Sequence, residues 1–307
     1  QMEDDEADAE KAVNAYNTLK DNGMKVFIGT VTTGACLSVV SQTKADNMFQ
    51  ITPSASAAKV IANDNCFQVC FTDPNQGTAS ADYIASKGLA TKVAVIYNSS
   101  DAYSSGIYDN FKAEAAAKGL DLVASEAFTG DSKQDFSSQL SKIKASGAEL
   151  IFLPIYYQEA SLILSQAKNA GITAKFFGCD GLDGLLNIEN FDKSLAENVM
   201  LLTPFAANAT DETTKKFVTA YNAKYDPSTL NQFAADAYDA VYVVKAAAEK
   251  AGVTGDMSVS DICNALKGAM TEITVDGVTG SGMTWKATGE VNKEPKAVKI
   301  ENGEYQP

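Results

Sequence analysis

Short runs of apolar residues alternate along the chain with longer stretches in which apolar residues recur every three or four positions. The apolar runs lie at residues 25–28, 48–51, 92–97, 122–127, 150–153, 175–177 and 199–202. The stretches with helical spacing lie at 8–22, 35–46, 74–87, 105–118, 136–146 and 159–170. Continuous apolar strands that alternate with helices are typical of parallel sheets covered on both faces. This part of the chain therefore predicts an α/β fold with doubly wound parallel sheets.

The rhythm changes after residue 202. Three helical stretches follow almost directly upon one another, and short β-like pieces and a hairpin-like return come last. The helices are expected at 212–225, 233–251 and 258–270, and the β-like pieces at 282–285 and 297–301. A length of 307 residues exceeds what one hydrophobic core of ordinary size organises, so we expect two domains.

The beginning of the sequence is unusual for such a fold. An acidic stretch and a helix precede the first predicted strand, whereas a parallel sheet normally opens with a strand. We therefore expect the first strand and helix of the fold to be missing from this sequence. No run of about 18 apolar residues occurs, so no membrane-spanning helix is expected.

The charge balance narrows the range of partners. The sequence has 39 acidic residues against 25 basic ones, all of them lysines, and a net charge of −14. Binding to nucleic acid or to an anionic membrane surface requires a basic face, so both are disfavoured. The absence of arginine also removes the usual bidentate clamp for a carboxylate. A carboxylate ligand would therefore rest on backbone N–H groups and hydroxyls.

Histidine is absent, which excludes a histidine-based catalytic triad and any zinc site that uses imidazole. No phosphate-binding loop follows a strand. The five cysteines are expected to be buried small apolar residues, and Cys66 and Cys70 lie about 13 Å apart along a strand, beyond disulfide reach. We therefore expect no catalytic residue, no metal site and no cofactor.

Two early loops offer groups suited to an anion. The loop at 30–35 carries three threonines and leads into a helix, whose N-terminus favours a negative charge. Thr33 could equally be the N-cap of that helix. The loop at 52–57 carries small residues and hydroxyls, so that a ligand could approach its backbone, although it could also be an ordinary turn.

Later loops offer aromatic rings and an acid. Tyr103 follows one strand, and Tyr156 and Tyr157 follow another, where two successive side chains cannot point the same way. Asp180 lies beside a glycine and suits an ammonium group, although aspartate is also common in turns. Taken together, the early and late loops match the two ends of a zwitterion held between two lobes.

These loops carry a family resemblance. The segments VFIGTVTTGACLSVVSQTKADNMFQITPSASA, CFTDPNQG and FFGCDGL, with the runs 92–106 and 150–159, resemble the branched-chain amino-acid-binding family of ABC-transporter substrate-binding proteins. These are type I periplasmic binding proteins. The resemblance extends from about residue 4 to about residue 285.

The resemblance implies two lobes joined by three hinge crossings. The crossings would fall near residues 71–73, 203–205 and 282–284. Lobe 1 would then comprise residues 1–72 and 205–283, and lobe 2 residues 73–204 and 284–307.

The resemblance also implies ligand-binding roles. The Thr33 hydroxyl would hold the ligand carboxylate, and the loop of Ser54, Ala55 and Ser56 would add backbone and hydroxyl contacts. Tyr103 would close on the ligand from the second lobe, Tyr156 would lie at its polar end, and Asp180 would pair with its ammonium. Phe233 would form a wall of the site, and Asp236 would lie close to the cleft. Asp180 is shorter than the glutamate usual in the family, so the ammonium would sit deeper or be bridged by water.

The function implied is that of an extracytoplasmic substrate-binding component of an ABC importer, without enzymatic activity. Its ligand would be a branched-chain or other small aliphatic amino acid, and its partner would be a membrane permease. The protein would be a monomer, located in the periplasm or lipid-anchored at the cell surface. Two alternatives remain open. The chain could be the ligand-sensing domain of a receptor with the same fold, or it could bind a different amino-acid-like or amide ligand.

Overall fold

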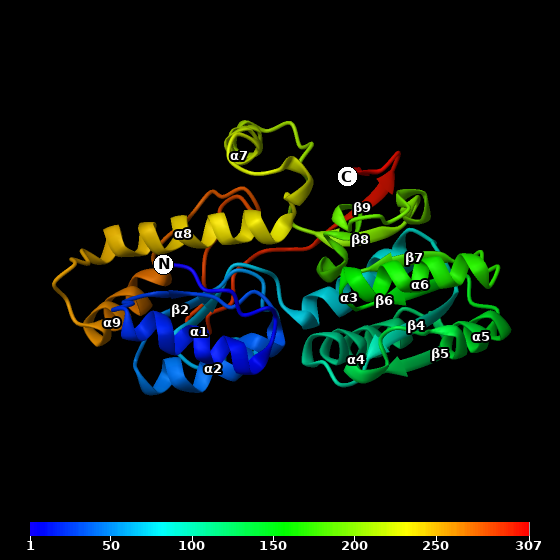
Figure 1. Ribbon diagram of the computed structural model, residues 1–307, viewed down its shortest axis with the longest axis horizontal. Coiled ribbons are helices and arrows are strands. Elements are labelled where there is room, and N and C mark those ends of the chain that lie inside the picture. The colour runs from blue at the N-terminus through cyan, green and yellow to red at the C-terminus, as the bar shows by residue number, and fades with distance from the viewer. Residues whose placement is uncertain (307) are drawn as a thin grey trace. The chain divides into compact units, whose positions relative to one another are not determined.

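The computed structural model describes residues 1–306 and divides into two compact units (Figure 1). Unit 1 comprises Gln1–Thr72 and Phe233–Glu294, and unit 2 comprises Asp73–Gln232 and the chain from Pro295 onward. The unit boundaries thus lie at 72/73, 232/233 and 294/295. The resemblance implies lobe boundaries at 72/73, 204/205 and 283/284, and the division into lobes stays a prediction. Pro307, the end of the predicted second lobe, lies outside the described residues.

Hydrogen bonds explain where the second and third unit boundaries fall. Between residues 205 and 232, Asn208 donates from Nδ2 to the carbonyl of Tyr305 at 2.8 Å, which keeps this segment in unit 2. Between residues 284 and 294, Trp285 donates from Nε1 to the carbonyl of Gln68 at 2.8 Å, which keeps that segment in unit 1. These partners are distant in sequence, so the sequence pattern alone did not reveal them.

Unit 1 is built on a three-stranded parallel sheet with the order β1-β2-β3. Its strands are β1 (Phe27–Ile28), β2 (Gln50–Thr52) and β3 (Cys66–Gln68). Helices α1 (Ala9–Asp21) and α2 (Thr33–Ala45) pack on one face around Phe27 and Met48. Helices α8 (Gln232–Ala251) and α9 (Val259–Met270) pack on the other face against Phe49 and Ile51. The alternation of side chains along each strand thus feeds two separate cores.

Unit 2 contains a seven-stranded sheet with the order β10-β9-β8-β7-β6-β4-β5. The strands are β4 (Lys92–Asn98), β5 (Asp121–Phe128), β6 (Leu150–Leu153), β7 (Lys175–Gly178), β8 (Met200–Thr203), β9 (Lys296–Glu301) and β10 (Glu304–Gln306). Strands β4 to β8 pair in parallel, whereas β9 and β10 add an antiparallel edge. The predicted α/β class and the C-terminal return are therefore confirmed.

Helices cover both faces of the larger sheet. Helices α3 (Asp73–Ser86) and α4 (Ala102–Ala117) share one core with the side chains of Val93, Val95 and Phe152. Helices α5 (Ser137–Ser146) and α6 (Tyr157–Asn169) share the other core with Ala94, Ile96 and Leu153. Helix α7 (Glu212–Asn222) follows β8. The neighbouring residues Val93 and Ala94 face opposite cores, as the pleat of a strand requires.

Some elements differ from the pattern-based prediction. Helix α4 begins at Ala102 instead of 105, because Asp101 is its N-cap and accepts a hydrogen bond from the backbone N–H of Ser104 at 3.1 Å. The β-like piece predicted at 282–285 forms only two isolated bridges, Val275 with Met283 and Trp285 with Val291. All five cysteines are buried and form no disulfide among residues 1–306, and their burial confirms the expectation for them.

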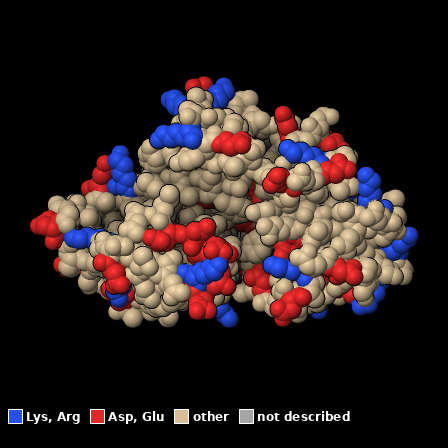
Figure 2. Space-filling view, in the orientation of Figure 1, with Lys and Arg blue, Asp and Glu red and all other residues tan. Residues whose placement is uncertain are grey.

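The chain exposes no extended basic face in the view of Figure 2, where lysines are scattered among acidic side chains. This distribution agrees with the net charge of −14. Among residues 1–306, no helix is long and apolar enough to cross a membrane.

Candidate functional site

The first candidate group lies in unit 1, where β1 leads into α2. Thr32 is the N-cap residue of α2, so the alternative role of Thr33 as the N-cap is wrong. The Thr33 side chain instead joins two loops, because its Oγ1 accepts hydrogen bonds from the backbone N–H groups of Ser56 and Ala57 at 3.2 and 3.4 Å. Thr33 is 1% exposed. The structure thus brings the two predicted anion-binding loops of this unit into contact.

The hydroxyls of Thr32 and Thr33 can still donate hydrogen bonds to a ligand. A threonine hydroxyl has one proton and two lone pairs, and Thr33 uses its lone pairs on the two N–H groups. Within residues 1–306 its proton has no hydrogen-bond acceptor, and the buried hydroxyl of Thr32 has no partner. Both hydroxyls lie at the N-terminus of α2, where the helix dipole favours a negative charge. The arrangement suits a carboxylate.

The loop after β2 is buried and formed of small residues. Ser54 is 6% exposed, and Ala55 and Ser56 are fully buried. The backbone N–H of Ala55 donates to Oγ1 of Thr52 at 2.9 Å, and that hydroxyl donates to the carbonyl of Thr30 at 2.6 Å. These two bonds fix the turn through the side-chain hydroxyl of Thr52. The ordinary-turn alternative describes this geometry, and the small side chains also allow close approach to the backbone.

The second candidate group lies in unit 2 and centres on Asp180, which follows β7. The Tyr103 hydroxyl donates to Oδ1 of Asp180 at 2.6 Å, and the backbone N–H of Asp180 donates to Oε1 of Gln76 at 3.1 Å. Asp180 is 3% exposed, and no lysine nitrogen lies within ion-pair distance of it among residues 1–306. Burial raises the pKa of its carboxyl to about 6, although the hydrogen bonds from Tyr103 and Gln76 oppose this. The site holds an acid without a cation.

Two tyrosines surround this acid. The rings of Tyr103 and Tyr156 stack with centroids 4.8 Å apart and planes 17° apart. The Tyr103 hydroxyl also accepts the backbone N–H of Gly181 at 2.9 Å, and burial raises its pKa well above the usual range, so it stays a donor toward Asp180. Tyr157 packs against the core formed with α5 and α6. The two successive tyrosines therefore point to different sides, as expected.

The predicted residues on α8 have separate surroundings in unit 1. Phe233 is half-buried. Asp236 is 1% exposed and lies 3.5 Å from the ammonium of Lys293, which also donates to Oγ1 of Thr279 at 2.5 Å. A buried ion pair of this kind fastens the segment before Pro295 to α8. The contact of Asp236 with a ligand stays a prediction.

The predicted residues thus fall into groups by unit. Thr33, Ser54, Ala55 and Ser56 gather in unit 1, with Phe233 and Asp236 on α8 of the same unit, and Tyr103, Tyr156 and Asp180 gather in unit 2. Sequence reasoning missed Gln76, Asp183 and Gln232, which are buried around Asp180. Their sequence neighbours form no motif that marks a polar role.

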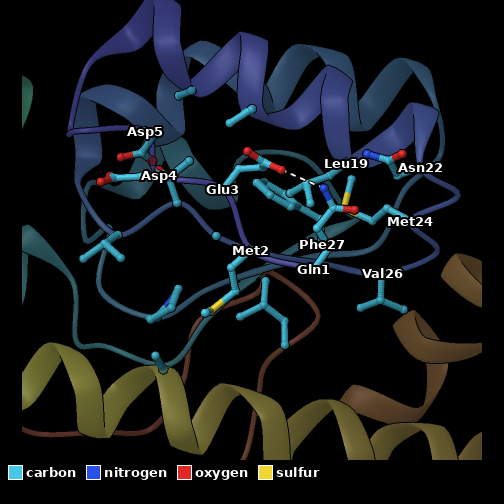
Figure 3. Close-up of a pocket in the computed structure, with 18 of the residues that line it drawn as sticks. Gln1, Met2, Glu3, Asp4, Asp5, Leu19, Asn22, Met24, Val26 and Phe27 are labelled. Carbon is cyan, nitrogen blue, oxygen red and sulfur yellow. Dashed lines mark hydrogen bonds between the residues drawn. The ribbon is translucent and has the colours of Figure 1, made fainter. Parts of the chain in front are cut away.

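Unit 1 also contains a cavity of about 710 Å³ (Figure 3). It lies along the edge of β1 that pairs with no other strand, between α1 and residues Ala237 and Val241 of α8. Gln1, Met2 and Glu3 line it, and Gln1 donates from Nε2 to Oε1 of Glu3 at 2.7 Å. None of the predicted ligand-binding residues lines this cavity. The described residues also contain no cluster of three or more acidic, cysteine or histidine side chains that could hold a metal.

Comparisons with known proteins agree with this architecture. A family model described as a periplasmic binding protein matches residues 1–304. The chain is similar to Leu/Ile/Val-binding protein homolog 3 of Brucella melitensis, with 32% identity over 256 residues that make up 82% of this chain and 68% of the relative. It is also similar to a leucine-, isoleucine-, valine-, threonine- and alanine-binding protein of Pseudomonas aeruginosa, with 28% identity over 85% of this chain and 69% of the relative.

Solved structures show the same fold. The leucine-binding protein LivK of Thermotoga maritima matches with a TM-score of 0.86 and 26% identity, over 99% of this chain and 84% of that one. The branched-chain amino acid transporter substrate-binding protein LivJ of Streptococcus pneumoniae, in complex with isoleucine, matches with a TM-score of 0.85 and 26% identity over the same shares. A solute-binding protein of R. palustris in complex with benzoate has a TM-score of 0.85 at 20% identity, which shows the fold alone.

Proposed function

This chain belongs to the periplasmic binding protein family, and on that basis we propose that it is the extracytoplasmic substrate-binding component of an ABC importer for small aliphatic α-amino acids. The observation that carries the proposal is the buried Asp180 carboxylate, which accepts a tyrosine hydroxyl but has no cationic partner among residues 1–306. A buried carboxylate is costly unless a cation or further donors satisfy it. The ammonium of an amino acid supplies both.

The other end of an amino acid suits the donors of unit 1. The hydroxyl protons of Thr32 and Thr33 and the N-terminus of α2 favour a carboxylate, and the buried backbone of Ser54 to Ser56 allows close approach. We assign the carboxylate to this group and the ammonium to Asp180, with Tyr103 and Tyr156 beside it. Phe233 would contribute an apolar wall. Asp236 would lie close to the ligand, with its carboxylate paired with Lys293.

The names of relatives support the ligand class. Several are named for binding leucine, isoleucine and valine, and one solved relative holds isoleucine. The benzoate complex shows that a protein of this fold can also bind an acid that has no ammonium group. Asp180 argues against such a ligand here, because a buried carboxylate repels an anion that brings no compensating cation.

The proposal assigns no chemical step to this site. The partner it requires is the membrane permease of the importer, which the protein would meet outside the cytoplasm. We further propose that the protein acts as a monomer, because one ligand-binding chain suffices for this role. Turnover of the bound amino acid, or a stable dimer in sedimentation measurements, would contradict these parts of the proposal.

The test is calorimetric titration with leucine, isoleucine, valine, benzoate and 4-methylpentanoate, which is leucine without its amino group. We expect at least one of the amino acids to bind and both simple acids to bind far more weakly. Asp180→Asn should weaken amino-acid binding by about 30-fold, because a hydrogen bond to a charged group contributes about 2 kcal/mol.

Asp46→Asn provides the matched control. Asp46 also accepts a tyrosine hydroxyl, that of Tyr16 at 2.8 Å, but it has Lys20 as its cation and lies in unit 1 away from the candidate groups. Its replacement should leave affinity unchanged. Tight binding of a simple acid, together with an unaltered affinity in Asp180→Asn, would overturn the assignment.

A further inference from the structure

Gln232 is a fully buried polar residue that the proposed ligand contacts do not include. It is the last residue of unit 2 and the first residue of α8. Its Nε2 donates to the carbonyl of Asp180 at 2.6 Å, and its Oε1 accepts the hydroxyl of Thr203 at 3.0 Å. Its backbone N–H donates to Oδ2 of Asp183 at 2.8 Å. One side chain and its own N–H therefore join the end of β8, the turn after β7 and the start of α8.

The turn that Gln232 holds is the one that carries the Asp180 carboxylate. The carbonyl of Asp180 also accepts the backbone N–H of Asp183 at 2.9 Å, so this oxygen is held from two sides. Gly181 packs so closely that a Cβ there would lie 2.7 Å from the carbonyl oxygen of Ile155 and from the Tyr103 hydroxyl. A turn fixed by its backbone in this way leaves the Asp180 side chain little freedom to search for a partner.

Asp183 adds an electrostatic link between the same turn and α8. Its carboxylate is 3% exposed and accepts an N–H at the first turn of α8, where the helix dipole favours negative charge. Burial raises the pKa of Asp183 to about 6, and the hydrogen bond from the Gln232 N–H opposes that rise. Displacement of Gln232 would therefore disturb both a neutral hydrogen bond and a charge interaction at the turn.

We propose that Gln232 is a positioning residue for the ammonium-binding carboxylate: from the start of α8 it fixes the turn that carries Asp180. This inference rests on the proposed function and adds a residue that does not touch the ligand. Glutamine is suited to the task because a single amide supplies the donor for the Asp180 carbonyl and the acceptor for Thr203.

The test variant is Gln232→Met, which keeps the length of the side chain and removes both of its hydrogen bonds. Gln232→Ala is the second variant in case the first folds poorly. Gln166→Met is the matched control, because the Gln166 amide also uses both its acceptor and its donor within unit 2: it accepts the backbone N–H of Phe136 at 2.8 Å and donates to the carbonyl of Gln134 at 2.9 Å. These partners lie in the segment before α5, not at the Asp180 turn.

The decisive readout compares L-leucine with 2-hydroxy-4-methylpentanoate, which replaces the ammonium by a hydroxyl. Gln232→Met should weaken leucine binding about tenfold and change binding of the hydroxy acid less than about twofold, because only the ammonium requires a well-placed Asp180. Gln166→Met should change neither affinity. An equal loss for both ligands would show a merely structural role for Gln232, and an unaltered leucine affinity would overturn the inference outright.

A second experiment uses the ligand-free protein, so its result does not depend on whether the proposed function is correct. In the ligand-free protein, carbon NMR follows the titration of the Asp180 carboxyl. Gln232→Met should move the midpoint toward that of an ordinary aspartate, because a loosened turn admits water, whereas Gln166→Met should not. If the wild-type protein binds no amino acid, the proposed function fails while this experiment still decides the role of Gln232. An unchanged midpoint in that case would refute the positioning role.

Discussion

The two candidate binding groups differ in the kind of interaction they leave open. In unit 1, Thr33 has satisfied lone pairs and a spare proton, so the group offers neutral donors. In unit 2, Asp180 is a buried acid that has a tyrosine donor but no lysine within ion-pair distance among residues 1–306. Burial of an unsatisfied neutral donor costs less free energy than burial of an ionised carboxylate. The difference teaches that the acid in unit 2 is the more costly group, and under the proposed function it would supply the selectivity for an amino group.

The largest expected effect is the pH dependence of this selectivity. Because the pKa of Asp180 is raised to about 6, the carboxyl is ionised at pH 7.5 and mostly neutral at pH 4.5. Amino-acid affinity should therefore fall by about 30-fold between these two pH values. Calorimetry across this range measures it, and Asp180→Asn should show a nearly flat profile. A flat profile in the wild-type protein would break the contrast between the two groups.

The second effect concerns the stability of the ligand-free protein. The pKa of Asp180 in the folded state, about 6, lies above the value of 3.8 for a free aspartate, so the folded state binds the proton more tightly. Stability contributed by protonation is therefore present below pH 3.8 and lost as the pH rises through 6.

Asp180→Asn should consequently raise the free energy of unfolding by about 3 kcal/mol at pH 7.5 and change it little at pH 3.5. Denaturant unfolding without ligand measures both values. No stabilisation at pH 7.5 would mean that the ionised carboxylate is better compensated than its contacts indicate. Thr33→Ser, made for the neutral group, should show no such pH-dependent difference.

A smaller effect is expected from the neutral group. Thr33→Val removes the hydroxyl and should weaken amino-acid binding about tenfold, whereas Thr33→Ser keeps the hydroxyl and should weaken it no more than about twofold. Calorimetry at pH 7.5 and at pH 5.5 separates this group from the acid, because the ratio between Thr33→Val and wild type should not change with pH. If the ratio of the two affinities changed with pH, Thr33 would not be the residue that binds the carboxylate of the ligand.

The smallest effect should come from Tyr103→Phe, which keeps the ring stacked on Tyr156 and removes the hydroxyl that donates to Asp180. This hydrogen bond lowers the pKa of Asp180, so its loss should raise that pKa further. Affinity should fall about threefold at pH 7.5, and the midpoint of its pH dependence should move upward. A downward movement of the midpoint would show that the hydroxyl does not stabilise the ionised acid.

Much of the fold follows from the sequence because its strands and helices are local patterns. The α/β class, the central strands of unit 2 and the covering helices were predictable from apolar runs and helical spacing. The second and third unit boundaries were not, because they depend on bonds such as that between Trp285 and Gln68, whose residues lie far apart in the chain. Periodicity carries no information about such pairs.

The candidate site was predictable to the extent that it lies in loops after strands. Tyr103, Tyr156 and Asp180 come together in unit 2, and Thr33 meets the loop of Ser56 in unit 1, although their ligand contacts remain a prediction. Gln232 was not predictable. A glutamine at the start of a helix usually faces water, and only the long return from β8 through α7 places this one beside Asp180.

The single tryptophan of the chain has a practical consequence. Trp285 is 4% exposed and lies in unit 1, while the stacked pair of Tyr103 and Tyr156 lies in unit 2. Indole fluorescence therefore serves as an intrinsic optical label for one half of the molecule, and the near-ultraviolet dichroism of the stacked phenols serves the other. Melting curves recorded with both signals would coincide if the halves unfold as one cooperative system and separate if each melts alone.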